Sequence, residues 1–184
     1  STSGAELRTN IGRAMWQCIG SRRFRDVKPG KHSVHRSSHL APCVPMLSLH
    51  GECWVITDAA AGNQRQALAL AARLQMPTRH LLLEPRAPWS WLAPRLTLGG
   101  RLALPASQRA WFAPPWPALA IGCGRAAALF TRMLRPLSAG RCHTVQILGP
   151  RLDPGLWDTV IAPRHDGLEG NNVLRPLGSL NPVE

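Results

Sequence analysis

The sequence predicts an α/β protein with a Rossmann-like, mostly parallel β-sheet and helices on both faces. Three observations support this fold class. Short apolar, β-branched runs alternate with helical stretches, prolines end those helical stretches, and the strand–helix–strand unit occurs twice along the chain. Such alternation is typical of a parallel sheet whose strands are joined by right-handed crossovers.

The first unit spans residues 53–84. The run "CWVIT" (53–57) is apolar and bounded by turn residues, which is typical of a buried parallel strand. A helix is predicted over 63–75, Pro77 ends it, and "RHLLLE" (79–84) is the next predicted strand. The apolar residues of the helical stretch share one face: Ala67, Leu70, Ala71 and Leu74.

The second unit repeats this order. A strand is predicted over 118–123, a helix over 124–137 with a stop at Pro136, and a strand over 143–148. Loops separate two further short apolar runs, 158–163 and 172–178. We therefore expect residues 53–184 to form one Rossmann-like domain.

An irregular connection, residues 85–117, joins the two units. Prolines and the pair Gly99-Gly100 interrupt it repeatedly, and connections of this length are often lids or binding segments. Within it, "PWSWLAPRL" alternates tryptophan with arginine, which suits packing onto the domain, contact with a membrane interface, or stacking on bases. Packing is favoured, and membrane contact ranks ahead of nucleic acid. The predicted membrane-contact residues are Trp89, Trp91 and Arg95.

Residues 1–52 have a different composition. They contain eight basic residues and four of the seven histidines, without a periodicity of 2 or 3.6, so we expect a disordered basic segment. Three interpretations stay open: a transit peptide, a nucleic-acid-binding tail, and sequence upstream of a true start at Met46, which is favoured. The cluster of His32, His35 and His39 shows no metal-ligand spacing with cysteine or carboxylate residues, and we predict no metal site.

Composition limits the function classes. The net charge is +12, from 22 basic against 10 acidic residues, which favours anionic partners such as phosphorylated substrates, phospholipid headgroups or nucleic acid. Five cysteines without a CxxC motif argue against a disulfide framework or a zinc site, and a cytoplasmic location is expected. No apolar run reaches the ~18 residues that span a bilayer.

The predicted ligand-binding residues lie after strands, because ligands of open parallel sheets bind beyond the carboxyl ends of the strands. Among them, "GCGR" opens a helix, where glycines let a ligand approach the backbone and free N–H groups attract an anion. Arg125 would add a bidentate contact. Glycines at such turns also have purely steric reasons, and the sequence is neither GxGxxG nor a Walker loop. The set comprises Asp58, Gly62, Asn63, Gly122, Gly124, Arg125 and Gln146.

The predicted catalytic pair is His165 with Asp166, in "RHDGL" just past a strand. An imidazole beside a carboxylate can act as a general acid or base, and a solvated local contact is the alternative. No serine or cysteine nucleophile lies on an elbow motif. Further strand-end residues are Arg151 and Asp153, Arg164, and finally Gly178, Ser179 and Asn181.

Three segments carry a family resemblance: "WVITDAAAGNQRQALALAARL", "PPWPALAIGCGR" and "HTVQILGPRLDPGLWDTVIAPRHDGLEGNNVLRPLGSLN". In this order they resemble the bacterial members of the mitochondrial-fission (elongated mitochondria) protein family, often labelled nucleoside-diphosphate-sugar epimerases. The resemblance covers residues 53–184. It departs from the family pattern at Ala59, Ala60 and Asn63, where the family tends to have glycine, a basic residue and histidine.

The resemblance implies a fold like that of GT-B glycosyltransferases, in which an N-terminal half holds the acceptor and a C-terminal half holds the nucleotide-sugar donor. The chain would then be a truncated or split N-terminal half without independent turnover. It would bind no cofactor itself, since the nucleotide sugar would need the C-terminal half.

The expected partners follow from the same resemblance. They are a glycan or glycolipid acceptor, an anionic membrane surface at the inner face of the membrane, and a second polypeptide supplying the C-terminal half. Two other function classes stay open: a basic peripheral-membrane module, and nucleic-acid binding through residues 1–52, which we regard as the weaker one.

Overall fold

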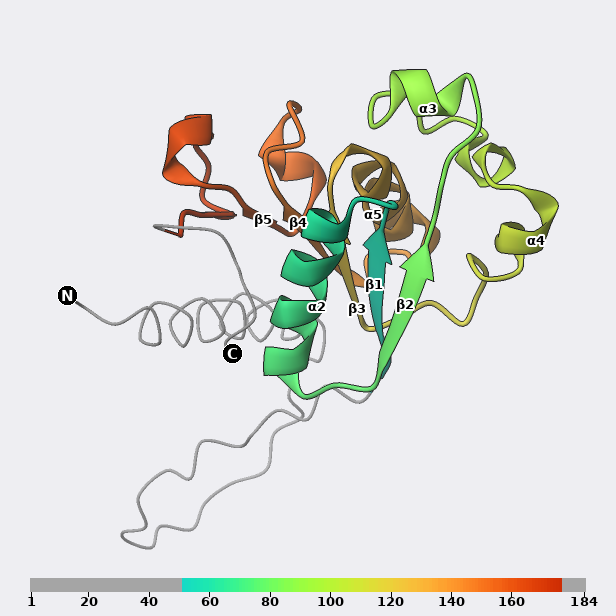
Figure 1. Ribbon diagram of the computed structural model, residues 1–184, viewed down its shortest axis with the longest axis horizontal. Coiled ribbons are helices and arrows are strands. Elements are labelled where there is room, and N and C mark those ends of the chain that lie inside the picture. The colour runs from blue at the N-terminus through green and yellow to red at the C-terminus, as the bar shows by residue number, and fades with distance from the viewer. Residues whose placement is uncertain (1–50, 177–184) are drawn as a thin grey trace, which may run out of the picture.

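The computed structural model describes residues 51–176 and shows one six-stranded sheet, with every strand parallel to its neighbours, in the order β2-β1-β3-β4-β5-β6 (Figure 1). The predicted α/β fold class is confirmed. The predictions for the segment before residue 51, and for the strand end at Gly178, Ser179 and Asn181, fall outside the described residues.

The elements follow the predicted order. The strands are β1 (Cys53–Thr57), β2 (Thr78–Leu82), β3 (Leu119–Cys123), β4 (His143–Ile147), β5 (Thr159–Ile161) and β6 (Val173–Leu174). The α-helices are α2 (Ala61–Leu74), α3 (Trp89–Leu92), α4 (Ala106–Arg109) and α5 (Arg125–Leu137). Three short 3-10 helices are η1 (Gly100–Ala103), η2 (Pro154–Leu156) and η3 (Arg164–Asp166).

The helix bounds differ slightly from the sequence prediction. Helix α2 begins two residues earlier, at Ala61, and ends at Leu74, because Gln75 adopts the left-handed conformation (φ 52°). Helix α5 begins one residue later, at Arg125, and ends at Leu137 as predicted, with Pro136 in its last turn.

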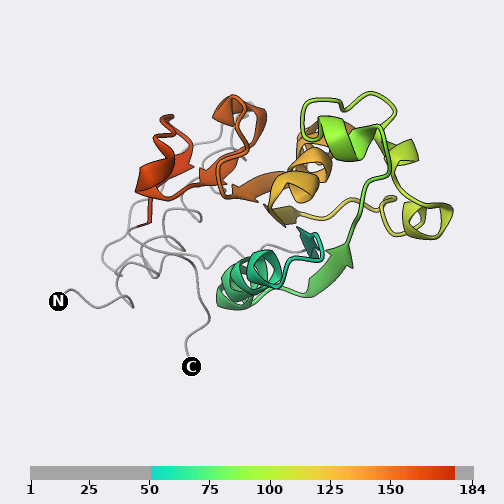
Figure 2. The same cartoon turned by 45° about the horizontal axis from the view of Figure 1, so that its top comes forward.

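Helix α2 covers one face of the sheet and α5 covers the other (Figure 2). The predicted apolar face of α2 is the one that packs against the sheet, on side chains such as Val55, Ile121 and Val145. On the α5 face, Trp54 and Phe130 are buried with Phe112 of the connection. Ring centroids of Phe112 lie 6.1 Å from Trp54 and 5.4 Å from Phe130, so the connection forms part of the core on this face.

The tryptophans of the connection separate into two groups. Trp116 packs against Trp54 with ring centroids 6.0 Å apart, and Trp89 is half-buried against the same core while its indole N–H donates to the Leu98 carbonyl at 2.9 Å. Trp91 and Trp111 are exposed. The segment predicted to be irregular therefore contains helical turns that fold back onto the α5 side of the sheet.

The strand order places a switch point between β1 and β3. From β1 the chain crosses by α2 on one face to β2, while from β3 it crosses by α5 on the other face to β4. The two helices consequently diverge from this point, and the carboxyl ends of β1 and β3 become the natural place for a ligand.

Candidate functional site

The turns that follow β1 and β3 lie side by side. The two strands are paired up to their last residues, Thr57 opposite Cys123. A Cβ atom added to Gly124 would lie 2.4 Å from Nδ2 of Asn63 and 2.9 Å from Oδ2 of Asp58. Three of the predicted ligand-binding residues, from two separate turns, therefore meet at one place.

In the turn after β1, the side chains hydrogen-bond to one another and to the backbone of the turn. Both carboxylate oxygens of Asp58 accept from Nδ2 of Asn63, at 3.0 and 3.1 Å, and Oδ1 also accepts from the Ala60 backbone N–H at 3.1 Å. The Asp58 carboxylate thus serves as an internal anion beside the N-terminus of α2. Gly62 is exposed in the first turn of α2, and a Cβ there would meet nothing within 4 Å.

The turn after β3 has no acidic residue of its own, although the Asp58 carboxylate of the neighbouring turn lies beside Gly124. Gly124 (φ 91°) precedes α5 without a side-chain cap, and the first turn of α5 has no acidic residue. Its leading N–H groups have no partner inside the helix, and the helix dipole makes this end positive. From beneath, Nε2 of the buried Gln146 donates to the Gly124 carbonyl at 3.1 Å, so this side chain fixes the turn.

Gly122 lies inside β3 and has a packing role. A Cβ atom at this position would lie 2.6 Å from Cγ2 of Thr131 and 2.8 Å from Oε1 of Gln146. The same Thr131 hydroxyl donates to Gln146 Oε1 at 3.1 Å and accepts from the Trp157 indole N–H at 2.9 Å. Glycine is therefore required here by the buried hydrogen-bond network, whatever the ligand.

A cavity of about 480 Å³ opens where β3 and β4 end. Three of its lining side chains are arginines, and among the described residues that line it none is acidic. The lining residues are Ala93, Pro94, Arg95, Gly124, Arg125, Gln146, Leu148, Gly149, Pro150 and Arg151. We refer to it as the arginine cavity.

The three arginines reach the arginine cavity from different elements. Arg125 begins α5, and its guanidinium donates to the carbonyls of Trp91 and Ala93, which ties the connection to the helix start. Arg95 belongs to the connection, and Arg151 follows β4 in a left-handed conformation (φ 53°). Arg95 and Arg151 are exposed and available to a ligand.

The predicted catalytic pair lies at the same edge of the sheet. Nε2 of His165 is 3.5 Å from Oδ1 of Asp166, and the other carboxylate oxygen accepts from the Gly149 backbone N–H at 3.3 Å. Asp166 thereby fixes the backbone at Gly149, which lines the arginine cavity. The His165 side chain is 82% exposed and does not line the arginine cavity, so its acid–base role stays a prediction.

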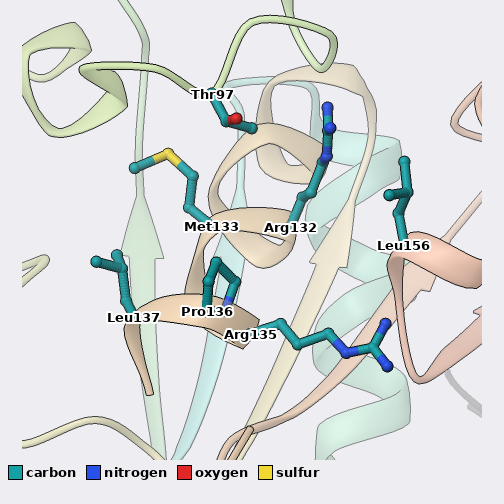
Figure 3. A pocket seen from close by; sticks show the side chains of 7 residues that line it. All are labelled: Thr97, Arg132, Met133, Arg135, Pro136, Leu137 and Leu156. Carbon is teal, nitrogen blue, oxygen red and sulfur yellow. The ribbon is translucent and has the colours of Figure 1, made fainter. Parts of the chain in front are cut away.

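A second cavity, of about 360 Å³, lies over the outer side of α5 (Figure 3). Its arginines are engaged within the fold. Arg132 donates to the carbonyls of Pro94 and Arg95 at 2.9 and 3.0 Å, and Arg135 donates to the Gly155 carbonyl at 2.7 Å. These bonds fasten the connection and η2 to α5, so this cavity is a weaker candidate for binding an anion.

The described cysteines are not suited to nucleophilic catalysis. Burial raises the pKa of the thiols of Cys53, Cys123 and Cys142 to about 12, so they stay protonated at neutral pH. Within residues 51–176, no group of three His, Cys, Asp or Glu side chains is placed to hold a metal ion. In that same range, no helix has the length and apolar character needed to cross a bilayer.

Two of the three arginines that line the cavity were absent from the predicted ligand-binding set, for different reasons. Arg151 follows the fourth strand and carries the strand-end signal, as does Gly149 beside it. Arg95 was predicted to contact a membrane, and its place in the cavity depends on how the connection folds back over α5. No local pattern in the sequence encodes that contact.

Comparison with known proteins gives one match. Residues 61–184, more than half of the chain, match the family described as Mitochondrial fission ELM1. No curated protein and no solved structure matches the chain.

Proposed function

The chain belongs to the Mitochondrial fission ELM1 family, and we propose that it forms the acceptor-side unit of a glycosyltransferase-like protein. In this role the arginine cavity binds a negatively charged group, phosphate or carboxylate, of a glycan or glycolipid acceptor. One observation carries the proposal: three arginines, and no acidic side chain among the described residues, line a cavity at the carboxyl ends of β3 and β4.

The chemistry of the lining groups favours an anion. Guanidinium groups bind phosphate and carboxylate through paired, charge-assisted hydrogen bonds. Gly124 and Arg125 begin a 13-residue helix, whose N-terminal N–H groups favour negative charge at the same place. Arg95 and Arg151 can approach such a group from the connection and from the loop after β4.

The neighbouring turn supports the choice of this cavity. At the N-terminus of α2, the Asp58 carboxylate already supplies the negative charge. The first turn of α5 has no acidic residue, and the Asp58 carboxylate lies beside Gly124 without lining the arginine cavity. An external anion is therefore favoured inside the arginine cavity, next to Arg95 and Arg151, and disfavoured at the turn after β1, where it would meet the Asp58 carboxylate.

The donor side belongs to a different unit under this proposal. A GT-B-like arrangement binds the nucleotide sugar on a second Rossmann-like unit, and the sheet described here supplies the acceptor side. We therefore expect residues 1–184 alone to bind the acceptor anion without transferring sugar. His165 is the candidate base for the acceptor hydroxyl, since it lies at the same edge of the sheet beside Asp166.

Titration calorimetry with inorganic pyrophosphate tests the binding site. We expect Arg151→Gln to weaken binding about tenfold or more, because it removes a charge-assisted contact. Arg73→Gln is the matched control: this exposed arginine lies in the last turn of α2, away from the carboxyl edge, and should leave the affinity within about twofold.

Equal affinities for the wild-type chain and Arg151→Gln would contradict the assignment of the arginine cavity. A separate assay addresses turnover. Sustained hydrolysis or transfer from a sugar nucleotide by the purified 184-residue chain would show that it does not depend on a second unit.

A further inference from the structure

The segment 91–102 exposes an unusual amount of apolar surface. Among the large hydrophobic side chains of residues 51–176, its four members are the most exposed: Leu98 (84%), Trp91 (73%), Leu102 (57%) and Leu92 (48%). They lie on α3, on η1 and on the loop between them, and α3 packs against η1. We call these four residues the apolar patch. Figure 1 shows α3 beyond the carboxyl ends of β1 and β2, and Figure 2 shows it on the same side of the sheet as α5.

The apolar patch is held in a fixed position. Trp89 anchors it from below, because its ring packs against the core and its indole N–H bonds the Leu98 carbonyl. Arg125 donates to the Trp91 carbonyl, and Arg132 donates to the carbonyls of Pro94 and Arg95. A rigid segment that presents large apolar side chains to solvent is typical of an interaction surface. Membrane contact was predicted for Trp89 as well, but its indole is used inside the fold.

The charge around the apolar patch is strongly positive. Arg95 and Arg101 are exposed in the same segment, and Arg86 is exposed shortly before it. From residue 85 to residue 152 the sequence contains no acidic residue at all. The arginines of this stretch are Arg86, Arg95, Arg101, Arg109, Arg125, Arg132, Arg135, Arg141 and Arg151.

We propose that the apolar patch docks on an anionic phospholipid bilayer. Tryptophan and leucine side chains would enter the boundary between headgroups and acyl chains, while Arg86 and Arg101 contact lipid phosphates. Charge complementarity favours an anionic bilayer over the other possible partners of the patch. A second copy of the chain would bring the same positive charge onto itself. Nucleic acid would find one exposed ring for stacking, Trp91, because the other three members of the patch are leucines.

Docking would bring the arginine cavity close to the lipid headgroups. Arg95 lines that cavity, and in sequence it lies between Trp91 and Leu98 of the apolar patch. A lipid-linked acceptor could then reach the cavity from the bilayer. Docking does not require an anion in the arginine cavity. The proposal that the patch binds a bilayer and the proposal that the cavity binds an anion can therefore be tested separately.

Co-sedimentation with vesicles tests the proposal, using the 184-residue chain and either phosphatidylcholine alone or phosphatidylcholine with phosphatidylglycerol. We expect binding to the anionic vesicles and little to the neutral ones. Trp91→Ala and Leu98→Ser should each weaken binding about tenfold, since each removes one apolar side chain from the bilayer boundary. Leu68→Ser, at an exposed position of α2 on the opposite face of the sheet, is the matched control and should bind like the wild-type chain.

Three results would overturn the proposal. They are absence of binding to anionic vesicles, equal binding to neutral vesicles, and unchanged binding of Trp91→Ala and Leu98→Ser. Size-exclusion chromatography tests whether a second copy of the chain binds the patch instead. A wild-type dimer that Leu98→Ser dissociates would assign the patch to that second copy. Pyrophosphate affinity of Leu98→Ser should equal that of the wild-type chain, which separates this test from that of the cavity.

Discussion

The turn after β1 and the turn after β3 occupy equivalent places in the fold, yet they use their residues differently. Each joins a buried strand to a helix at the switch point of the sheet, and both are rich in small residues. In the first, Asp58 accepts hydrogen bonds from Asn63 and from the Ala60 backbone. In the second, Gly124 begins α5 beside three arginines and has no acidic residue in its own turn; neither helix has a side-chain cap.

Small residues at a strand end therefore do not by themselves indicate a ligand-binding site. What matters is which charged side chains surround the turn: Asp58 bonds within the first, and Arg95, Arg125 and Arg151 line the cavity beside the second. The glycines show the same contrast, because Gly62 has open space around it whereas Gly124 has a left-handed φ and close neighbours.

The largest expected effect follows from Gly124→Ala. The new Cβ would lie 2.4 Å from Nδ2 of Asn63, and φ 91° is strained for any side chain. We expect a loss of about 2–4 kcal/mol in the free energy of unfolding, measured by urea denaturation. A loss below about 0.5 kcal/mol would show that the two turns are not locked together as described.

A medium effect is expected from Asp58→Ala, which removes the internal anion of the first turn. Loss of the hydrogen bonds to Asn63 and Ala60 should lower the free energy of unfolding by about 1–2 kcal/mol. Glu169→Ala, at an exposed carboxylate, is the control and should change it by less than about 0.5 kcal/mol. A change below about 0.5 kcal/mol for Asp58→Ala would show that these hydrogen bonds do not hold the turn.

The smallest effect is expected from Gly62→Ala. Its Cβ would point into open space in the first turn of α2, so the substitution only reduces the freedom of the unfolded chain. Thermal and urea unfolding should both report a gain of about 0.5–1 kcal/mol. A loss of stability would mean that the two glycines are equivalent after all.

The sequence predicts the regular part of the fold well because local patterns encode it. Buried parallel strands are continuous apolar runs, and the face of α2 with Ala67, Leu70 and Leu74 follows the helical period. The strand-end rule also places Asp58, Asn63 and Gly124 at one edge, where the structure brings them together.

The rest depends on contacts between distant residues. Nothing near Arg95 in the sequence indicates that it lines a cavity with Arg151, because that contact requires the connection to fold over α5. For the same reason, the sequence could not show that Gly122 of "GCGR" is needed for packing whereas Gly124 forms the turn before α5. Gly122 is fixed by Thr131 and Gln146, which follow it in the chain by 9 and 24 residues.

The hydrogen bonds of Arg125 to the Trp91 and Ala93 carbonyls have a thermodynamic consequence. A ligand anion that recruits this guanidinium must compete with the bonds that hold the segment bearing Trp91. Occupancy of the arginine cavity and the position of the apolar patch would then be linked equilibria. Such linkage is reciprocal: if an anion changes the affinity for the bilayer by some factor, the bilayer changes the affinity for the anion by the same factor.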